Sequence, residues 1–159
     1  ELLRLNPADN QGVRYLYLPL LLRLGRDAEA ARFMKEAQDE PTANWTYTRA
    51  LLAYRLGGDN LSAKTELRKA VKANPHVVEH LLADQGPDAM PEAYSLGSRE
   101  EAIICAEQLR SAFQSTPGAM DWLQTHGHTF TAKQKHIGKH NDRRVRRKRR
   151  AKERKRKRR

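Results

Sequence analysis

Apolar residues recur every three or four positions along most of this chain, which is the spacing that places them on one face of an α-helix. The clearest stripe consists of Val13, Leu16, Tyr17, Leu20, Leu21 and Leu24. Gly25 is expected to end this helix, and Pro19 predicts a kink within it, because proline removes one backbone hydrogen bond. No segment alternates as a half-buried strand would, so the pattern predicts an all-α fold.

Three further helices are expected before residue 75. The second begins with Asp27 as its cap and ends near Pro41, and the third covers about residues 44–56. The fourth follows Asn60 as its cap and ends before Pro75. Glycine or proline therefore separates each of these helices from the next.

Beyond the fourth helix the chain is expected to be less regular. Residues 84–97 contain two glycines and two prolines and are typical of a loop. Ser98 followed by Glu101 is a capping-box pattern for a helix through about Gln114. A last short turn is expected to carry Trp122.

Two stretches of the chain repeat with a period of 33 or 34 residues. Gly25 and Gly58 are 33 residues apart, two alanine pairs keep the same offset, and Pro41 and Pro75 are 34 apart. Tetratricopeptide repeats have this period, with one helix–turn–helix per repeat. The pattern therefore predicts tetratricopeptide-like helix–turn–helix repeats, a fragment of an α-solenoid. The alternative is an ordinary helical bundle with alanine-rich contacts.

Two segments add a family resemblance to this period. Residues 6–16 (NPADNQGVRYL) and 73–76 (ANPH) resemble the tetratricopeptide-like segment of the suppression-of-tumorigenicity family and related bacterial proteins. The resemblance covers about residues 5–82 and extends towards Trp122. It implies a helical-repeat scaffold without established catalysis, and it does not include the basic end of the chain.

Stacked repeats would place the first helices of the two units on one concave surface. Aromatic and arginine side chains there suit an extended peptide with acidic groups, because arginine binds carboxylates bidentately and tryptophan supplies contact area. The alternative is that Tyr15 and Trp45 are buried against a neighbouring helix. The candidate partner-binding residues are Tyr15, Arg23, Trp45, Thr48, Leu52 and Arg55.

Charge divides the chain into two unequal parts. The net charge is +12, but residues 133–159 hold 17 of the 31 lysines and arginines and two of the 19 acidic residues, a net charge of +15. Residues 1–132 carry −3. Such asymmetry points to an appendage that binds polyanions. We accordingly predict a helical-repeat domain over residues 1–125 and a basic, largely disordered tail over 126–159.

The tail predicts non-specific binding to nucleic-acid phosphates. Residues 143–159 contain 14 lysines and arginines, too few apolar groups to fold alone, and no aromatic residue for base stacking. A nuclear-import signal and a tail without function are the alternatives. The candidate nucleic-acid-binding residues are Arg143, Arg144, Arg146, Arg147, Lys148, Arg149, Arg150, Lys152, Arg154, Lys155, Arg156, Lys157, Arg158 and Arg159.

Catalytic and metal-binding patterns contribute little to the prediction. His136 and His140 have a spacing suited to one helix face, but lysines surround them and oppose a cation. Cys105, the single cysteine, lies in an apolar run and is expected to be a packed thiol. Phosphate-loop, Gly-x-Ser-x-Gly and His-Glu-x-x-His motifs are absent from the sequence. We expect no metal and no cofactor.

These observations predict a non-catalytic scaffold, not an enzyme. The repeats would hold a protein or peptide, and the tail would bind RNA or DNA. The expected location is cytoplasmic, or nuclear in a eukaryote, without a membrane span, because the longest apolar stretch is much shorter than about 20 residues. The alternative is a C-terminal or regulatory fragment of a larger enzyme, since the chain begins without Met in what looks like a helix end.

Overall fold

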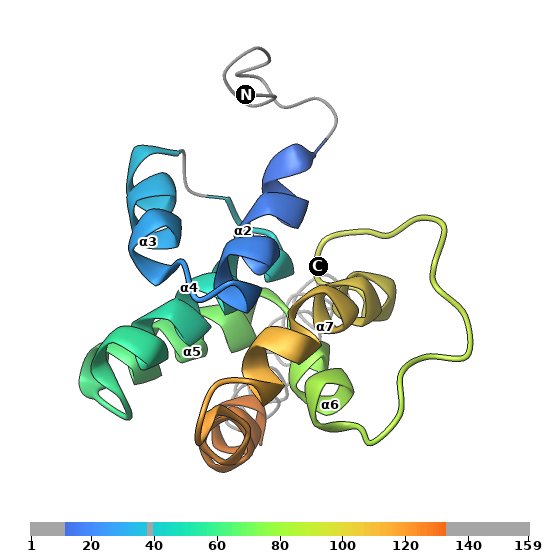
Figure 1. Cartoon of the computed structure of the whole chain (residues 1–159). Coiled ribbons are helices and arrows are strands. Elements are labelled where there is room, and N and C mark those ends of the chain that lie inside the picture. Colours follow the sequence, from blue (N-terminus) through green and yellow to red (C-terminus); the bar gives the residue numbers. More distant parts are fainter. Residues whose placement is uncertain (1–11, 38–39, 133–159) are drawn as a thin grey trace, which may run out of the picture.

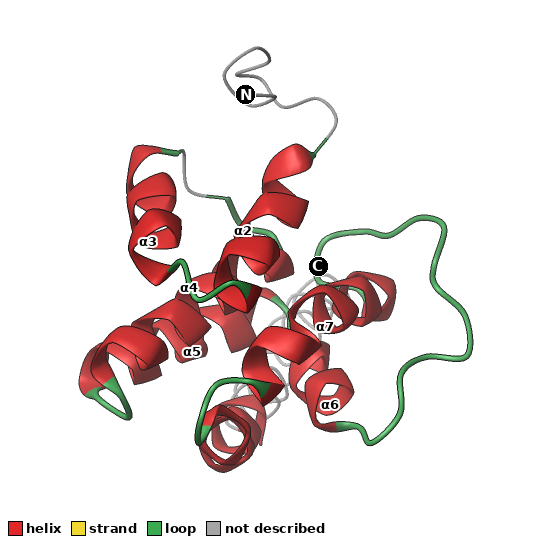
Figure 2. Ribbon diagram, viewed as in Figure 1, coloured by secondary structure: helices red, strands yellow, loops and turns green. Residues whose placement is uncertain are grey.

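The computed structural model describes residues 12–37 and 40–132, and every regular element in this part of the chain is a helix (Figures 1 and 2). The all-α prediction is therefore confirmed for these residues. The helices are α2 (Val13–Arg23), α3 (Asp27–Glu36), α4 (Ala43–Gly57), α5 (Leu61–Ala73), α6 (His76–Leu82) and α7 (Arg99–Gln114), followed by a helix over residues 119–132. The basic residues 133–159 lie outside the described residues.

Polar side chains start three of the helices as N-caps. Thr42 accepts a hydrogen bond from the backbone N–H of Trp45 at the start of α4, and Asn60 accepts one from Ala63 at the start of α5. Ser98 caps α7 by accepting from Glu101, so the Asn60 and Ser98 predictions are confirmed. The Asp27 prediction is wrong by one position, because Arg26 precedes α3 without a side-chain cap.

The apolar face expected for α2 is the buried one only in part: Leu21 is buried and Tyr17 packs against the core, but the rest of the stripe is not. Leu16, Leu20 and Leu24 are 65%, 46% and 60% exposed, whereas Leu18 and Leu22 are fully buried. The reason is that residues 15–22 are apolar all round the helix, so periodicity alone does not select a side. The buried side is decided by tertiary contacts, because α2 packs against α3, α4 and α7. Pro19 lies inside α2, which continues to Arg23.

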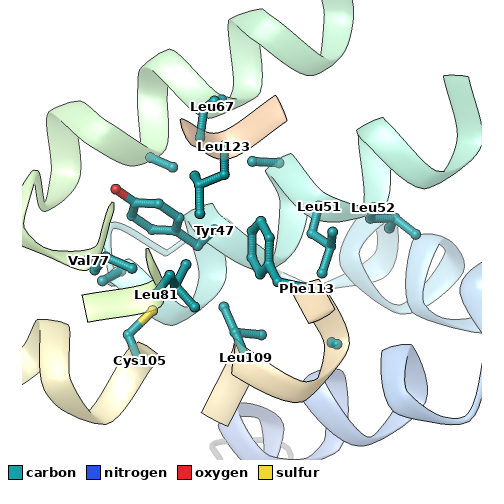
Figure 3. Packing of buried hydrophobic residues seen from close by; sticks show 14 of the residues in the cluster. Tyr47, Leu51, Leu52, Leu67, Val77, Leu81, Cys105, Leu109, Phe113 and Leu123 are labelled. Atoms are coloured by element: carbon teal, nitrogen blue, oxygen red, sulfur yellow. The ribbon is translucent and has the colours of Figure 1, made fainter. Parts of the chain in front are cut away.

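The core forms where α4 meets α5, α6 and α7. Figure 3 shows the rings of Tyr47 and Phe113 among leucine and valine side chains from neighbouring helices. The Tyr47 hydroxyl is buried and donates a 2.9 Å hydrogen bond to the carbonyl oxygen of Asn74. This bond ties the middle of α4 to the end of α5.

The chain returns to its beginning through α7. The loop over residues 83–98 runs from α6 back to the start of α7, and it bulges away from the helices in Figure 1. From there α7 packs against α6, α4 and α2. Elements far apart in sequence are thus brought together at one junction, formed by α2, α4 and α7.

The domain boundary predicted at residue 126 falls inside the last helix. Phe130 and Thr131 are buried beyond that boundary. Phe130 also lies beneath the Arg68 guanidinium at 4.8 Å and stacks on His126. The packed body therefore extends to at least residue 132, because two buried residues past the boundary hold the helix to α5 and its own preceding turn.

Among the described residues, no helix combines the length and the apolar character that crossing a membrane requires.

The packing of α2 predicts opposite outcomes for two neighbouring leucines. Leu18→Ala empties a fully buried site and should lower the free energy of unfolding by about 2–5 kcal/mol. Leu20→Ala, on the half-exposed side, should lower it by less than about 1 kcal/mol. Urea denaturation followed by circular dichroism measures both, and equal losses would contradict the face assigned to α2.

Candidate binding cleft between α2, α4 and α7

The structure gives the predicted groove residues packing partners inside the body. Trp45, Thr48 and Leu52 are buried, and the Trp45 ring lies 6.3 Å from that of Phe33 in α3. The surface expected from these three side chains is therefore not exposed in this fold, because α3 and the neighbouring helices cover them. The alternative raised for Trp45, burial against a neighbouring helix, matches its position.

Two of the remaining three groove residues are hydrogen-bonded within the body. Arg55 donates hydrogen bonds of 2.6 Å to the carbonyl oxygen of Leu22 and 2.8 Å to the carboxylate of Asp27. Tyr15 hydrogen-bonds through its hydroxyl to Glu40, while Arg23 is exposed at the end of α2. A partner-binding role for the six residues stays a prediction.

A different feature, the carboxylate of Glu101, organises the junction of α2, α4 and α7. Glu101 is 5% exposed and accepts hydrogen bonds from three N–H groups. The donors are the backbone N–H of Ala43 at 2.8 Å, the side-chain amide of Asn74 at 2.9 Å and the backbone N–H of Gly97 at 2.7 Å. Glu101 thus connects α7 to the first residue of α4, to the end of α5 and to the end of the long loop.

The charge of Glu101 sits at the positive ends of two helix dipoles. It is the third residue of α7, and its side chain binds the N–H of the first residue of α4. Each helix N-terminus is equivalent to about half a positive charge. The two ends therefore offset the buried carboxylate without a cationic side chain.

A cleft of about 200 Å³ opens beside Glu101. Its walls come from the start of α2, the start of α4, the loop before α7 and one face of α7. The lining residues are Gly12, Tyr15, Leu16, Thr42, Asn44, Tyr94, Glu101, Ile104, Cys105 and Gln108. Apolar and aromatic side chains make up half of this set, and Glu101 is its only charged member.

Asn44 is the polar residue of the cleft with an unused acceptor. It is 6% exposed, and its amide nitrogen donates to the side-chain oxygen of Gln108 at 2.6 Å and to the carbonyl of Tyr15 at 3.4 Å. The carbonyl oxygen of Tyr15 can only accept, which places the amide nitrogen of Asn44 on its side. Its Oδ1 is left buried without a hydrogen-bond partner among the described residues.

Two ionisable groups of the cleft are held in their neutral forms. Burial, followed by the hydrogen bond and charge of Glu40, raises the pKa of Tyr15 above its ordinary value. Burial, with the charge of Glu101 second, raises the pKa of the Cys105 thiol well above its ordinary value. Cys105 is thus the packed thiol that the sequence predicted, because a thiol held neutral is a poor nucleophile.

A second polar cluster joins the α4–α5 turn to the last helix. Asp59 accepts a hydrogen bond from the indole N–H of Trp122 at 3.1 Å and contacts His126 at 3.2 Å and Lys64 at 3.1 Å. Partial desolvation raises the pKa of Asp59, but the hydrogen bonds and charges of Lys64 and His126 outweigh it, so the pKa lies below its ordinary value. The cluster therefore joins the α4–α5 turn to the last helix at the surface of the molecule.

The described residues contain no group of three or more His, Cys, Asp and Glu side chains placed to hold a metal ion. His126 pairs with Asp59, and His128 is exposed. The pair that sequence spacing singled out, His136 and His140, lies outside the described residues, as do all the candidate nucleic-acid-binding residues.

Comparison of the chain with models of protein families, with curated proteins and with solved structures gives no significant match. The resemblance to the suppression-of-tumorigenicity family therefore stays a prediction.

Sequence reasoning did not find the cleft. Glu101 was interpreted only as part of the N-terminus of its own helix, and Gln108 and Tyr94 were not singled out. The available signal was the capping-box glutamate itself. Its carboxylate would ordinarily accept from the backbone N–H of Ser98, but that N–H donates to the carbonyl oxygen of Ser95, which leaves the carboxylate to bind elsewhere.

Removing the Glu101 carboxylate should destabilise the fold strongly. Glu101→Ala leaves buried N–H donors of α4, Asn74 and the loop without their acceptor, and should lower the free energy of unfolding by about 3 kcal/mol. Glu100→Ala, next to it and exposed, is the control and should cost less than about 1 kcal/mol. Thermal and urea unfolding measure both, and similar losses would show that Glu101 does not join the helices.

The Asp59 cluster predicts a dependence of stability on acid pH. Because the folded-state pKa of Asp59 is lowered, its contribution is complete above the unfolded-state pKa of about 4 and is lost as pH falls through the folded-state value. Asp59→Asn should therefore flatten the fall of unfolding free energy below about pH 5. Asp121→Asn, which changes an exposed carboxylate on the last helix, should not change that slope. An unchanged slope in Asp59→Asn would show that the Asp59 cluster does not stabilise the fold.

Proposed function

We propose that this chain is a non-catalytic interaction scaffold, with a helical body that holds a protein or peptide and a basic end that binds nucleic-acid phosphates. One observation carries the proposal: the net charge of +15 is confined to residues 133–159, while the preceding residues carry −3. A folded domain that bound nucleic acid through its own surface would carry the excess positive charge on that surface.

Tetratricopeptide-like organisation of residues 13–75 is the structural part of this proposal. The offsets of 33 and 34 residues support it, as do the order of α2, α3, α4 and α5 and the contacts of α4 with both helices of the first unit. The contact of α7 with α2 departs from an open stack, in which each unit touches only its neighbours. We therefore propose two repeat-like units closed by α7.

The partner surface is proposed on the exposed side of α2, because Trp45, Thr48 and Leu52 of the predicted groove are buried. The exposed leucines of α2, namely Leu16, Leu20 and Leu24, follow one another at four-residue spacing and so share a side of the helix. Apolar side chains grouped on a surface mark interaction sites more often than scattered ones do. This side of α2 also borders the cleft, since Leu16 belongs to both.

The nucleic-acid part of the proposal is tested through the dependence of binding on salt. The full chain should bind single- and double-stranded oligonucleotides tightly at low salt, with log K falling linearly against log salt concentration as counterions are released. A variant of equal length with the 14 cations of residues 143–159 replaced by glutamine should lose this binding. Fluorescence anisotropy of labelled oligonucleotides measures both.

A matched control separates charge from sequence in that experiment. A variant with residues 143–159 in scrambled order keeps composition and net charge and should bind as the original chain does, because no aromatic residue is present to read bases. Unchanged retention in the glutamine variant would remove nucleic-acid binding from the proposed function.

A further inference from the structure

We infer that copies of this chain associate head to tail, with the loop over residues 83–98 of one copy seated in a groove between α3, α4 and the start of α5 of the next. This contact goes beyond the proposed function, because it joins the chain to itself and requires neither nucleic acid nor another protein. Two surfaces carry the inference: they complement each other in apolar character and in charge, and they lie apart within one molecule.

The first surface is a groove of about 450 Å³ with an apolar base. Ala31 and Met34 of α3 and Leu52, Ala53 and Leu56 of α4 form this base. Met34 and Leu52 are nearly buried, whereas Leu56 is 63% exposed. Apolar side chains thus line the groove from the core of the molecule to the solvent.

The charged residues that line the groove are both cations, Lys35 on α3 and Arg49 on α4. Asn60 and Ser62 complete the lining at the start of α5, whose first turn carries no acidic residue to offset the positive end of the helix dipole. Lys35 is exposed and has no ion-pair partner among the described residues. The groove therefore suits an apolar side chain that is accompanied by carboxylates.

The composition of the groove favours a protein segment over nucleic acid. Phosphates gain nothing from an apolar base, and no aromatic residue lines the groove for a nucleobase to stack on. A peptide offers apolar and anionic side chains along one backbone. The occupant we assign is therefore a peptide segment that carries both.

The second surface, the loop over residues 83–98, has this chemistry. It contains three carboxylates and no lysine, arginine or histidine. Met90 is 53% exposed and lies two residues from Asp88 and two from Glu92, which are exposed as well. Neither carboxylate has an ion-pair partner in the described part of the chain. Pro91 disfavours a helical conformation of Met90, so the segment presents an apolar side chain between two carboxylates on extended backbone.

The spacing of these groups suits the groove. Four residues of extended chain span about 13 Å, and neighbouring helix axes lie about 8–10 Å apart. Asp88 and Glu92 can therefore straddle the groove and meet the cations of α3 and α4, while Met90 fills the apolar base between them. Methionine adapts to irregular apolar sites, and the charge pairs add specificity more than affinity.

The positions of the two surfaces make the contact intermolecular. The loop extends beside α6 and α7, whereas α3 and the turn between α4 and α5 lie on the other side of the molecule (Figure 1). One copy therefore gives its loop on one side and accepts a loop on the other. A contact between two different surfaces leaves both ends of a pair open, so it continues into a row of copies.

The contact is small, so we expect it to form at high protein concentration. One loop in one groove buries less than the roughly 1,200 Å² of a standard interface, which corresponds to a dissociation constant of about 100 µM. The like charges of residues 143–159 oppose the approach of two copies. The variant with glutamine in place of these cations should therefore associate more tightly than the full chain.

Sedimentation velocity of the nuclease-treated full chain tests the association directly. Between about 10 µM and about 1 mM the average mass should rise with concentration and pass that of a dimer. Lys35→Glu and Met90→Asp, both at exposed positions, should each weaken the association at least about tenfold. The matched controls are Arg23→Glu and Leu20→Asp, which make the same kinds of change on the exposed side of α2 and should leave it unaltered.

Mixing the two weakened variants tests the pairing of loop and groove. The Lys35→Glu variant keeps its loop and the Met90→Asp variant keeps its groove, so the mixture should form pairs with the affinity of the unmodified contact. These pairs should not grow further, because each of their two outer surfaces is an altered one.

Four results would overturn the inference. The first is a monomer up to about 1 mM in both the full chain and the glutamine variant, a measurement that needs no change to the groove or the loop. The second is a mixture that stays monomeric. The third is an association that Leu20→Asp removes and Lys35→Glu does not, which would place the contact on α2. The fourth is an oligonucleotide that shifts the NMR signals of Lys35 and Ser62 in the glutamine variant, which would assign the groove to nucleic acid.

A failure of this contact and a failure of the proposed function are told apart. Lys35→Glu and Met90→Asp leave residues 143–159 unchanged, and the anisotropy experiment reads those residues alone.

Discussion

The fold depends on a single buried carboxylate that joins four parts of the chain. Glu101 reaches from α7 to the first N–H of α4, to Asn74 at the end of α5 and to Gly97 at the end of the loop. Asn74 in turn accepts from the Tyr47 hydroxyl and from the backbone of His76. Helix order along the chain would allow an open stack, and this network explains why α7 instead returns to α4.

A charge in such a position is stable only because the backbone compensates it. Burying a carboxylate costs several kcal/mol unless donors replace the water it loses. Here three N–H groups and two helix N-termini do so, and none of them is a side-chain cation. The surroundings of Glu101 are therefore polar and electrically balanced.

Local chemistry along the chain predicted the helices well, and the three-dimensional contacts poorly. Asn60, Ser98 and the loop over residues 84–97 follow from capping and turn preferences, which act over a few residues. The buried face of α2 followed only in part, because its apolar residues surround the helix and only the positions of α3, α4 and α7 decide which are covered. The helix over residues 119–132 was underestimated because Phe130 is fixed by Arg68 and His126, contacts that periodicity does not contain.

The same distinction explains why the candidate site escaped sequence analysis. A groove was expected from aromatic and arginine residues at repeat-like positions, but such residues serve equally as core and as inter-helix ties, which is how Trp45 and Arg55 are used. In the cleft, Asn44 instead meets Tyr15, 29 positions away, and Gln108, 64 positions away, and this meeting depends on the return of α7. A site of this kind has no sequence motif, because what defines it is the meeting of residues far apart in the chain.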